Sequence, residues 1–159
     1  MKVWDLHCDT LSELRRAEKN GTPASFAHND LHIDLEKLQA GDYMLQCLAA
    51  FVNLADPTPG ADPLVTALEE IDVFKRIMAK YPDRIAPVYT AADIRKNAEA
   101  GKISGLLTVE EGGCCKGSLG VLRRMYPTMK KYVNACRDGL CLSGRDGAPA
   151  HDRGREPSF

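Results

Sequence analysis

No stretch of the sequence is apolar over anything near the ~20 residues that a membrane-spanning helix requires, so we expect no membrane segment. An excess of either charge is also absent, since 21 Lys+Arg face 22 Asp+Glu, and this balance argues against a basic nucleic-acid-binding surface. Behind Lys2 there is no apolar core of the kind that a secretory signal carries. These absences predict a cytoplasmic globular protein, and 159 residues fit a single domain by length.

Cysteine and glycine motifs with a recognised spacing are missing as well. None of the six cysteines forms a Cys-x-x-Cys pair, and adjacent Cys114 and Cys115 have poor geometry for a bridge or a zinc knuckle. No phosphate-binding glycine motif surrounds Gly112-Gly113, which argues against a nucleotide site. In a reducing compartment we expect mostly buried thiols at Cys8, Cys47, Cys114, Cys115, Cys136 and Cys141.

What the chain does contain is an alternation of apolar strands and amphipathic helices. The predicted strands cover residues 3–8, 44–52, 85–89 and 103–110. The stretch 44–52 is apolar without alternation, as in a strand buried on both faces of a parallel sheet, although a core helix has the same pattern. Strands and helices that alternate at this spacing predict an α/β fold with a parallel sheet and crossover helices.

Capping residues mark the ends of the predicted helices. The predicted N-caps are Thr10 (in a capping box with Glu13), Asp34, Asp62 (before Pro63), Thr90 (with Asp93) and Ser118, and the predicted stops are Asn20-Gly21, Gly41 and Gly101. Apolar residues at helical spacing after Pro63 predict one buried stripe, made of Leu64, Leu68, Ile71, Phe74 and Met78. Composition alone predicts a loop at 56–60.

The pentapeptide Asp5-Leu6-His7-Cys8-Asp9 is the most informative stretch for chemistry. On a strand, Asp5, His7 and Asp9 would share one face, and Cys8 would point away from it. His7 and Asp9 would then meet at the C-terminal end of the first strand, where parallel α/β proteins build their sites. An imidazole beside a carboxylate suits zinc or a similar divalent ion. A hydrogen-bonded turn is the alternative interpretation.

Glu110 strengthens the interpretation as a metal site. It ends the apolar stretch 103–110, and a carboxylate there is costly unless it is paired or bound to a cation. If both strands belong to one barrel, His7, Asp9 and Glu110 lie at the same rim, and a carboxylate can bridge two ions that activate a water. The alternative, a solvated strand end, stays open. The other polar candidates fit structural roles better: His28 and His32 in a loop, Lys130-Lys131 on a solvated face, and His151 without context.

Four stretches together carry a family pattern. They read DLHCDT, HNDLHIDLEKLQAGDYMLQCLAAFVN, SGLLTVEEGG and GSLGVLRRMY. In this order they resemble the membrane dipeptidase (renal dipeptidase) family of zinc metallopeptidases, peptidase family M19, over residues 1–126. The resemblance implies a TIM-type (β/α)8 barrel, similar to that of the amidohydrolases, with two zinc ions at its C-terminal rim. It also implies hydrolysis of dipeptides by a metal-bridging hydroxide.

The same resemblance assigns the ligands. His7 and Asp9 match the His-x-Asp ligands of the first metal, and Glu110 matches the carboxylate that bridges both metals. Glu111 stands where relatives often have glycine and receives no role. No catalytic residue is assigned beyond these three metal ligands, and the substrate-binding residues stay unknown.

The family pattern does not continue after Tyr126. The next family strand has no match, and neither do the two later histidines that complete the second metal site. We therefore expect the incomplete N-terminal portion of a barrel at 1–126 and at most one zinc ion. Residues 137–159 are rich in glycine and charge and poor in large apolar side chains, and we expect an irregular, poorly ordered tail at 127–159. A truncation or shift of reading frame near residue 127 would explain the change.

Three functions follow as expectations. The first is a zinc-dependent dipeptidase, impaired in this chain. The second is an inactive barrel fragment, or a metal-binding module that works only as a homo-oligomer, because an incomplete sheet leaves an unpaired edge. The third is another two-metal amidohydrolase, although those usually begin with His-x-His.

Overall fold

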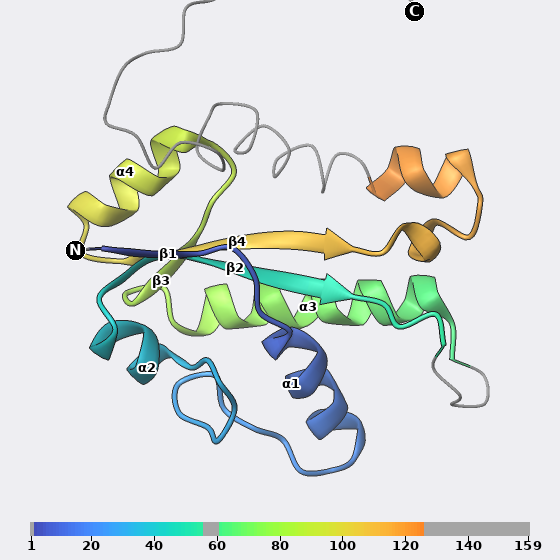
Figure 1. The fold of residues 1–159 in the computed structure, drawn as a ribbon, viewed down its shortest axis with the longest axis horizontal. Coiled ribbons are helices and arrows are strands. Elements are labelled where there is room, and N and C mark those ends of the chain that lie inside the picture. The colour runs from blue at the N-terminus through green and yellow to red at the C-terminus, as the bar shows by residue number, and fades with distance from the viewer. Residues whose placement is uncertain (1, 56–60, 126–159) are drawn as a thin grey trace, which may run out of the picture.

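The computed structural model of the protein describes residues 2–55 and 61–125 (Figure 1). The predicted loop at 56–60 and the predicted tail at 127–159 lie outside the described residues, and so do Lys130, Lys131, Cys136, Cys141 and His151. Within residues 2–55 and 61–125, no helix is both long and apolar enough to cross a membrane.

Strands and helices alternate along the chain, as predicted. The strands are β1 (Val3–Asp5), β2 (Tyr43–Phe51), β3 (Ile85–Pro87) and β4 (Ile103–Glu110). The helices are α1 (Thr10–Lys19), α2 (Leu35–Ala40), α3 (Pro63–Lys80) and α4 (Ala91–Glu99). A short 3-10 helix, η1 (Gly112–Cys115), and a helical segment at 119–125 follow β4.

The strands form one parallel sheet in the order β1-β2-β4-β3, so the predicted α/β architecture is confirmed. Because β4 lies between β2 and β3, the spatial order differs from the order along the chain. Figure 1 shows α1, α2 and α3 on one face of the sheet and α4 on the other. Two neighbouring residues of β4, Ser104 and Gly105, contact helices on opposite faces of the sheet. The Ser104 hydroxyl accepts from the Asn97 side-chain amide of α4 at 3.2 Å. A Cβ atom on Gly105 would lie 2.7 Å from the terminal methyl group of Met78 of α3, so the end of the Met78 side chain packs closely over this position.

The ladder between β2 and β4 forms the centre of the sheet. Seven residue pairs connect the two strands, from Leu45 beside Ser104 to Phe51 beside Glu110. Residues 45–50 of β2 are all buried, which confirms the strand predicted from the unbroken apolar run. The register therefore places the last residue of β4 beside the last residue of β2.

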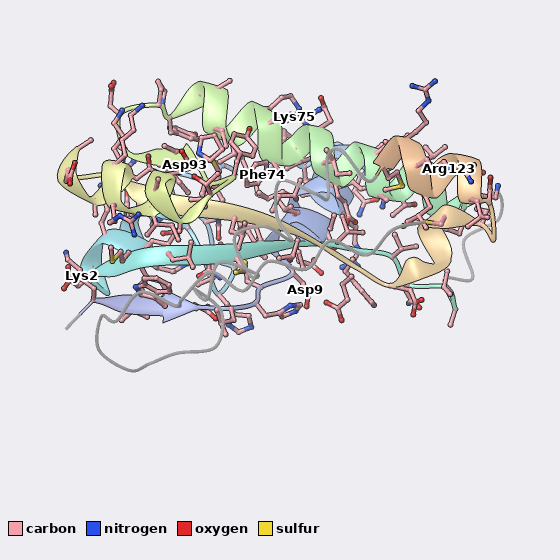
Figure 2. The ribbon with its side chains drawn as sticks, turned by 90° about the horizontal axis from the view of Figure 1, so that it is seen from above. Lys2, Asp9, Phe74, Lys75, Asp93 and Arg123 are labelled. Carbon is pink, nitrogen blue, oxygen red and sulfur yellow. The ribbon has the colours of Figure 1, made fainter. Side chains whose placement is uncertain are left out.

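Helix α3 packs one face against the sheet. Figure 2 shows Phe74 on the side of α3 that faces the sheet and its neighbour Lys75 on the outer side. Ile71, Phe74 and Met78 of the predicted stripe are buried, but the prediction was wrong for Leu68, which is 50% exposed. The buried face is rotated toward Ala67 and Val73, since these residues and not Leu68 turn inward against the strands.

Most predicted caps are present, but the cap of α1 was predicted wrongly. The Asp62 carboxylate accepts from the N–H groups of Leu64 and Val65, and Thr90 forms the predicted capping box with Asp93. Thr10, by contrast, is the first residue inside α1, and the N-cap is Asp9. Thr10 thus lies one position too late in the chain to act as the N-cap residue.

Asp34 shows how one buried carboxylate organises a loop and a helix. It is fully buried at the N-cap of α2, where it accepts from the N–H groups of Lys37 at 2.7 Å and Asn29 at 3.1 Å. The Lys37 ammonium lies 2.9 Å from the same carboxylate. Burial alone would raise the pKa of Asp34, but these donors lower it to about 2. Its contribution to stability is therefore present above the ordinary carboxyl pKa and is lost as the pH falls toward 2.

Replacing Asp34→Ala should lower the free energy of unfolding by about 2 kcal/mol at neutral pH, because α2 loses its cap and the N–H groups of Lys37 and Asn29 lose their acceptor. Urea denaturation followed by circular dichroism measures the change. Asp30→Ala, in the exposed part of the same loop, is the matched control and should change stability by less than about 0.5 kcal/mol. Equal effects of the two substitutions would contradict the capping role of Asp34.

Glu70 is a second buried carboxyl group, and its environment shifts the pKa upward, opposite to the shift at Asp34. The side chain is 1% exposed and lies on the inner face of α3. Burial raises the pKa of Glu70 to about 7, although the Ser12 hydroxyl, the Arg15 guanidinium and the Phe51 N–H all act to lower it. Because the folded pKa lies above the unfolded one, this carboxyl costs stability as the pH rises from about 4.5 to 7.

The Glu70→Gln variant should therefore gain stability relative to the wild type across that interval, by about 3 kcal/mol in total. The gain arises because the amide does not ionise, whereas the wild-type carboxyl must lose its proton inside the core. Denaturant unfolding of both proteins at pH 4.5, 5.5, 6.5 and 7.5 measures the difference. Parallel stability profiles for the two proteins would contradict the raised pKa.

Candidate metal centre

His7 and Asp9 lie in the segment that joins β1 to α1. The predicted strand 3–8 was too long, because β1 ends at Asp5. The Asp5 carboxylate accepts from the His7 N–H at 3.2 Å, and this local turn removes that N–H from strand pairing. The carbonyl of Cys8 accepts from the Ala49 N–H at 3.0 Å, which ties the segment to β2. The side chains of His7 and Asp9 are therefore positioned by a turn that is hydrogen-bonded to β2, and not by the alternation of side chains along a strand.

Asp9 is the N-cap residue of α1, but its carboxylate does not cap the helix. Its backbone carbonyl accepts from the N–H groups of Ser12 and Glu13, at 3.0 and 3.3 Å, but its side chain makes no capping hydrogen bond. The carboxylate instead faces His7, with Oδ1 3.3 Å from Nε2 of the ring. Because the Asp9 carboxylate makes no capping hydrogen bond, its charge is directed at the imidazole of His7.

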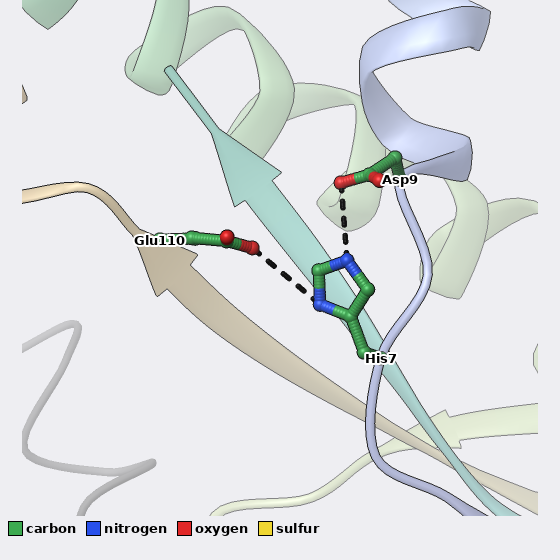
Figure 3. A group of neighbouring side chains, drawn as sticks. All are labelled: His7, Asp9 and Glu110. Atoms are coloured by element: carbon green, nitrogen blue, oxygen red, sulfur yellow. Dashed lines mark ion pairs between the residues drawn. The ribbon is translucent and has the colours of Figure 1, made fainter. Parts of the chain in front are cut away.

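Glu110 reaches the same imidazole from β4. Its Oε2 atom lies 3.5 Å from Nδ1 of His7, so the ring stands between two carboxylates, as Figure 3 shows. His7, Asp9 and Glu110 each keep about half of the side chain exposed, at 51%, 52% and 50%. The predicted residues are therefore brought together at one open edge of the sheet, despite a separation of about a hundred positions along the chain.

The donor set fits a divalent metal ion. One ligand atom from each of His7, Asp9 and Glu110 can be chosen so that all three lie within 4.8 Å of one another. Metal–ligand bonds of about 2.0–2.2 Å in a tetrahedral site separate neighbouring ligand atoms by roughly 3.3–3.6 Å, so small side-chain rotations suffice. An imidazole with two carboxylates is a donor set that zinc and related ions accept. Among the described residues this is the one cluster of its kind.

The other candidates from the sequence remain apart from the cluster. His28 is exposed and pairs with Glu36 at 2.9 Å, and His32 lies in the same loop outside the metal cluster. Burial raises the pKa of the Cys8 thiol, and Cys8 is not one of the three residues of the cluster. Cys8, Cys114 and Cys115 are free thiols in the structure.

Glu111 is a feature of the site that the sequence prediction left without a role. Its φ of 76° and ψ of 113° lie in a region that side-chain-bearing residues rarely adopt. Its carboxylate caps η1 by accepting from the Gly113 N–H at 3.3 Å. Gly113 in turn lies against Leu54, whose side chain a Cβ atom would meet at 2.3 Å. The turn directly after Glu110 is therefore both strained and closely packed.

Replacing Glu111→Gly should stabilise the protein by about 1 kcal/mol, because relief of backbone strain exceeds the loss of one exposed hydrogen bond. Glu111→Ala removes the same hydrogen bond but keeps the strain, so it should destabilise the protein. Thermal unfolding of both variants measures the two effects. A loss of stability in both variants would show that the carboxylate matters more than the backbone conformation.

Residues 1–134 match the membrane dipeptidase family, Peptidase family M19. Dipeptidase ataJ of Aspergillus terreus (strain NIH 2624 / FGSC A1156) is 30% identical, and the match covers 89% of this chain and 39% of that protein. Dipeptidase verJ of Clonostachys rogersoniana is 26% identical over 76% of this chain and 34% of its own length. The chain therefore spans between a third and two fifths of the length of these curated relatives.

The fold has solved counterparts. A metallo peptidase from Rhodobacter sphaeroides, in a structure liganded with a phosphinate mimic of the dipeptide L-Ala-D-Ala, has a TM-score of 0.67. It is 21% identical, and the match covers 80% of this chain and 43% of that one. This likeness confirms the predicted α/β fold as part of a TIM-type barrel. With the family match over residues 1–134, it leads to one conclusion: the chain belongs to the membrane dipeptidase family, Peptidase family M19.

Proposed function

We propose that this chain supplies part of the zinc centre of a dipeptidase, an enzyme that hydrolyses the amide bond of dipeptides. The observation that carries the proposal is the convergence of His7, Asp9 and Glu110 at the carboxyl-terminal edge of the sheet. Support for the substrate class comes from the relatives, which bear the name dipeptidase, and from the dipeptide mimic bound in the Rhodobacter sphaeroides structure.

Each of the three residues has a role in this proposal. His7 and Asp9 would hold the first metal, and the Glu110 carboxylate, with two oxygens, would reach a first and a second metal. A bound zinc ion supplies Lewis acidity, which polarises an amide carbonyl and makes a water easier to deprotonate. The half-exposed side chains leave the edge open to a ligand as small as a dipeptide.

The proposal assigns at most one zinc ion to this chain and an impaired activity. The described residues contain one cluster of suitable donors, and the matched relatives are between two and three times as long. The alternative is an inactive fragment or a metal-binding module that forms by oligomerising. Its support is the sheet itself, in which β1 and β3 are edge strands within the described part of the chain.

Zinc binding by the purified chain tests the ligand assignment. The wild type should bind about one zinc ion, and His7→Ala and Glu110→Gln should each weaken binding at least about tenfold. Competition with a chromophoric chelator measures the dissociation constants. His28→Ala is the matched control, because His28 also pairs with a glutamate at the surface but lies outside the cluster, and its affinity should equal that of the wild type.

Two further measurements separate the alternatives. Release of amino acids from a dipeptide should be slow or absent with the zinc-loaded chain, and any turnover should disappear in His7→Ala. Rapid turnover that depends on His7 would contradict the impaired activity, and turnover that survives His7→Ala would contradict the site. Activity confined to an oligomer on size-exclusion chromatography would support the oligomeric module.

A further inference from the structure

The segment that carries His7 has little packing of its own to hold it in place. Leu6, directly before His7, is 53% exposed, and the His7 side chain is 51% exposed. Burial in the core therefore does not fix the backbone at this point, and hydrogen bonds must do so. Because the ligands of a metal ion have to stay within about 0.5 Å of their productive positions, these hydrogen bonds matter for the candidate metal centre.

Asp5 supplies the hydrogen bond at His7 itself. Its Oδ1 atom accepts from the His7 N–H at 3.2 Å. Asp5 is also the last residue of β1, where it pairs with Gln46 of β2. The backbone of the histidine is therefore held by the side chain of a residue that belongs to the sheet.

A second hydrogen bond fixes the chain on the other side of His7. The Cys8 carbonyl accepts from the Ala49 N–H of β2 at 3.0 Å. Gln46 and Ala49 are three residues apart, as are Asp5 and Cys8, so the segment stays alongside β2 beyond the end of β1. His7 thus lies between two attachments to the same strand, and the Asp5 carboxylate makes the one at its own N–H.

The direction of the His7 side chain makes the position of its backbone important. Figure 3 shows the imidazole extending across β2 toward Glu110, with Asp9 at the other side of the ring. Nδ1 lies 3.5 Å from Glu110 Oε2, and Nε2 lies 3.3 Å from Asp9 Oδ1. Because the ring is rigid, a rotation of the His7 backbone changes both distances together.

We propose that Asp5 is a positioning residue for the metal centre, which acts as a hydrogen-bond acceptor and not through its negative charge. This inference rests on the proposed function. Asp5 is outside the cluster of His7, Asp9 and Glu110, and its Oδ1 atom is engaged by the His7 N–H. Water screens the charge of a partly exposed carboxylate, whereas the hydrogen bond acts on the His7 backbone directly.

Three substitutions at Asp5, each made in the full chain, separate the acceptor from the charge. Asp5→Asn keeps an Oδ1 acceptor without the charge, so its zinc affinity should stay within about threefold of the wild type. Asp5→Ala removes both, and Asp5→Glu keeps the charge but moves the acceptor by one methylene group. These two variants should each bind zinc at least about tenfold more weakly, as expected for loss of a group that orients a ligand. Competition with a chromophoric chelator measures the dissociation constants.

Glu13→Ala is the matched control for loss of a carboxylate close to the centre. Glu13 lies in the first turn of α1 and pairs with Arg16 at 2.5 Å, so its replacement should leave zinc affinity within about threefold of the wild type. Equal affinities of Asp5→Asn and Asp5→Ala would overturn the proposal, because these variants share the loss of charge and differ in the acceptor. If Asp5→Ala does not fold, Asp5→Asn and Asp5→Glu decide: wild-type affinity in Asp5→Glu with a loss in Asp5→Asn would overturn the proposal.

Backbone order parameters of the zinc-free chain, measured by NMR relaxation, give a readout that does not depend on zinc. The order parameter of the His7 amide should be about 0.85 in the wild type and in Asp5→Asn, and below about 0.6 in Asp5→Ala. The Gln46 amide in β2 is the internal reference and should stay at about 0.85 in every variant.

The two measurements also separate this proposal from the proposed function. If the wild type binds no zinc, the proposed function fails, and the order parameter of His7 still decides whether Asp5 holds the turn. An unchanged order parameter of His7 in Asp5→Ala would overturn the positioning role even if the wild type binds zinc.

Discussion

The parallel ladder between β2 and β4 is the constraint on which the rest of the structure depends. Residues 45–50 of β2 and 103–107 of β4 are buried, with α3 on one face of the sheet and α4 on the other. A shift of one residue would turn every side chain of a strand to the opposite face. That cost fixes Glu110 beside Phe51. The Cys8 carbonyl accepts from the Ala49 N–H of β2, so the segment after β1 is fixed relative to β2. The same ladder therefore also fixes where His7 and Asp9 lie relative to Glu110. The candidate metal centre is thus a consequence of sheet register.

The polar groups around this edge divide according to their exposure. Asp9 and Glu110 are half-exposed, so water and an imidazole can offset their charge without a metal. Glu70 is 1% exposed, and burial raises its pKa to about 7. A core carboxyl of this kind detracts from stability at neutral pH.

The sequence predicted the α/β alternation and the proximity of His7, Asp9 and Glu110 where the information is local or strongly patterned. The run 103–110 became β4 with the predicted bounds, and Asp62-Pro63 and the Thr90 capping box begin their helices as expected. Local competition explains the errors: the Asp5 carboxylate captures the His7 N–H and ends β1 early. The cap predicted at Thr10 was wrong by one residue, because α1 begins at Thr10 and its N-cap is Asp9. The burial of Glu70 was not predicted, because adjacent acidic residues on a helix are typical of a solvated face.

X-ray diffraction from crystals of the zinc-loaded chain, recorded on both sides of the zinc absorption edge, tests the central claim most directly. The anomalous difference map should show one strong peak between the side chains of His7, Asp9 and Glu110, within bonding distance of His7 and both carboxylates. A map whose strongest peak lies elsewhere, for example between His28 and Glu36 or at the Cys114-Cys115 thiols, would contradict the account.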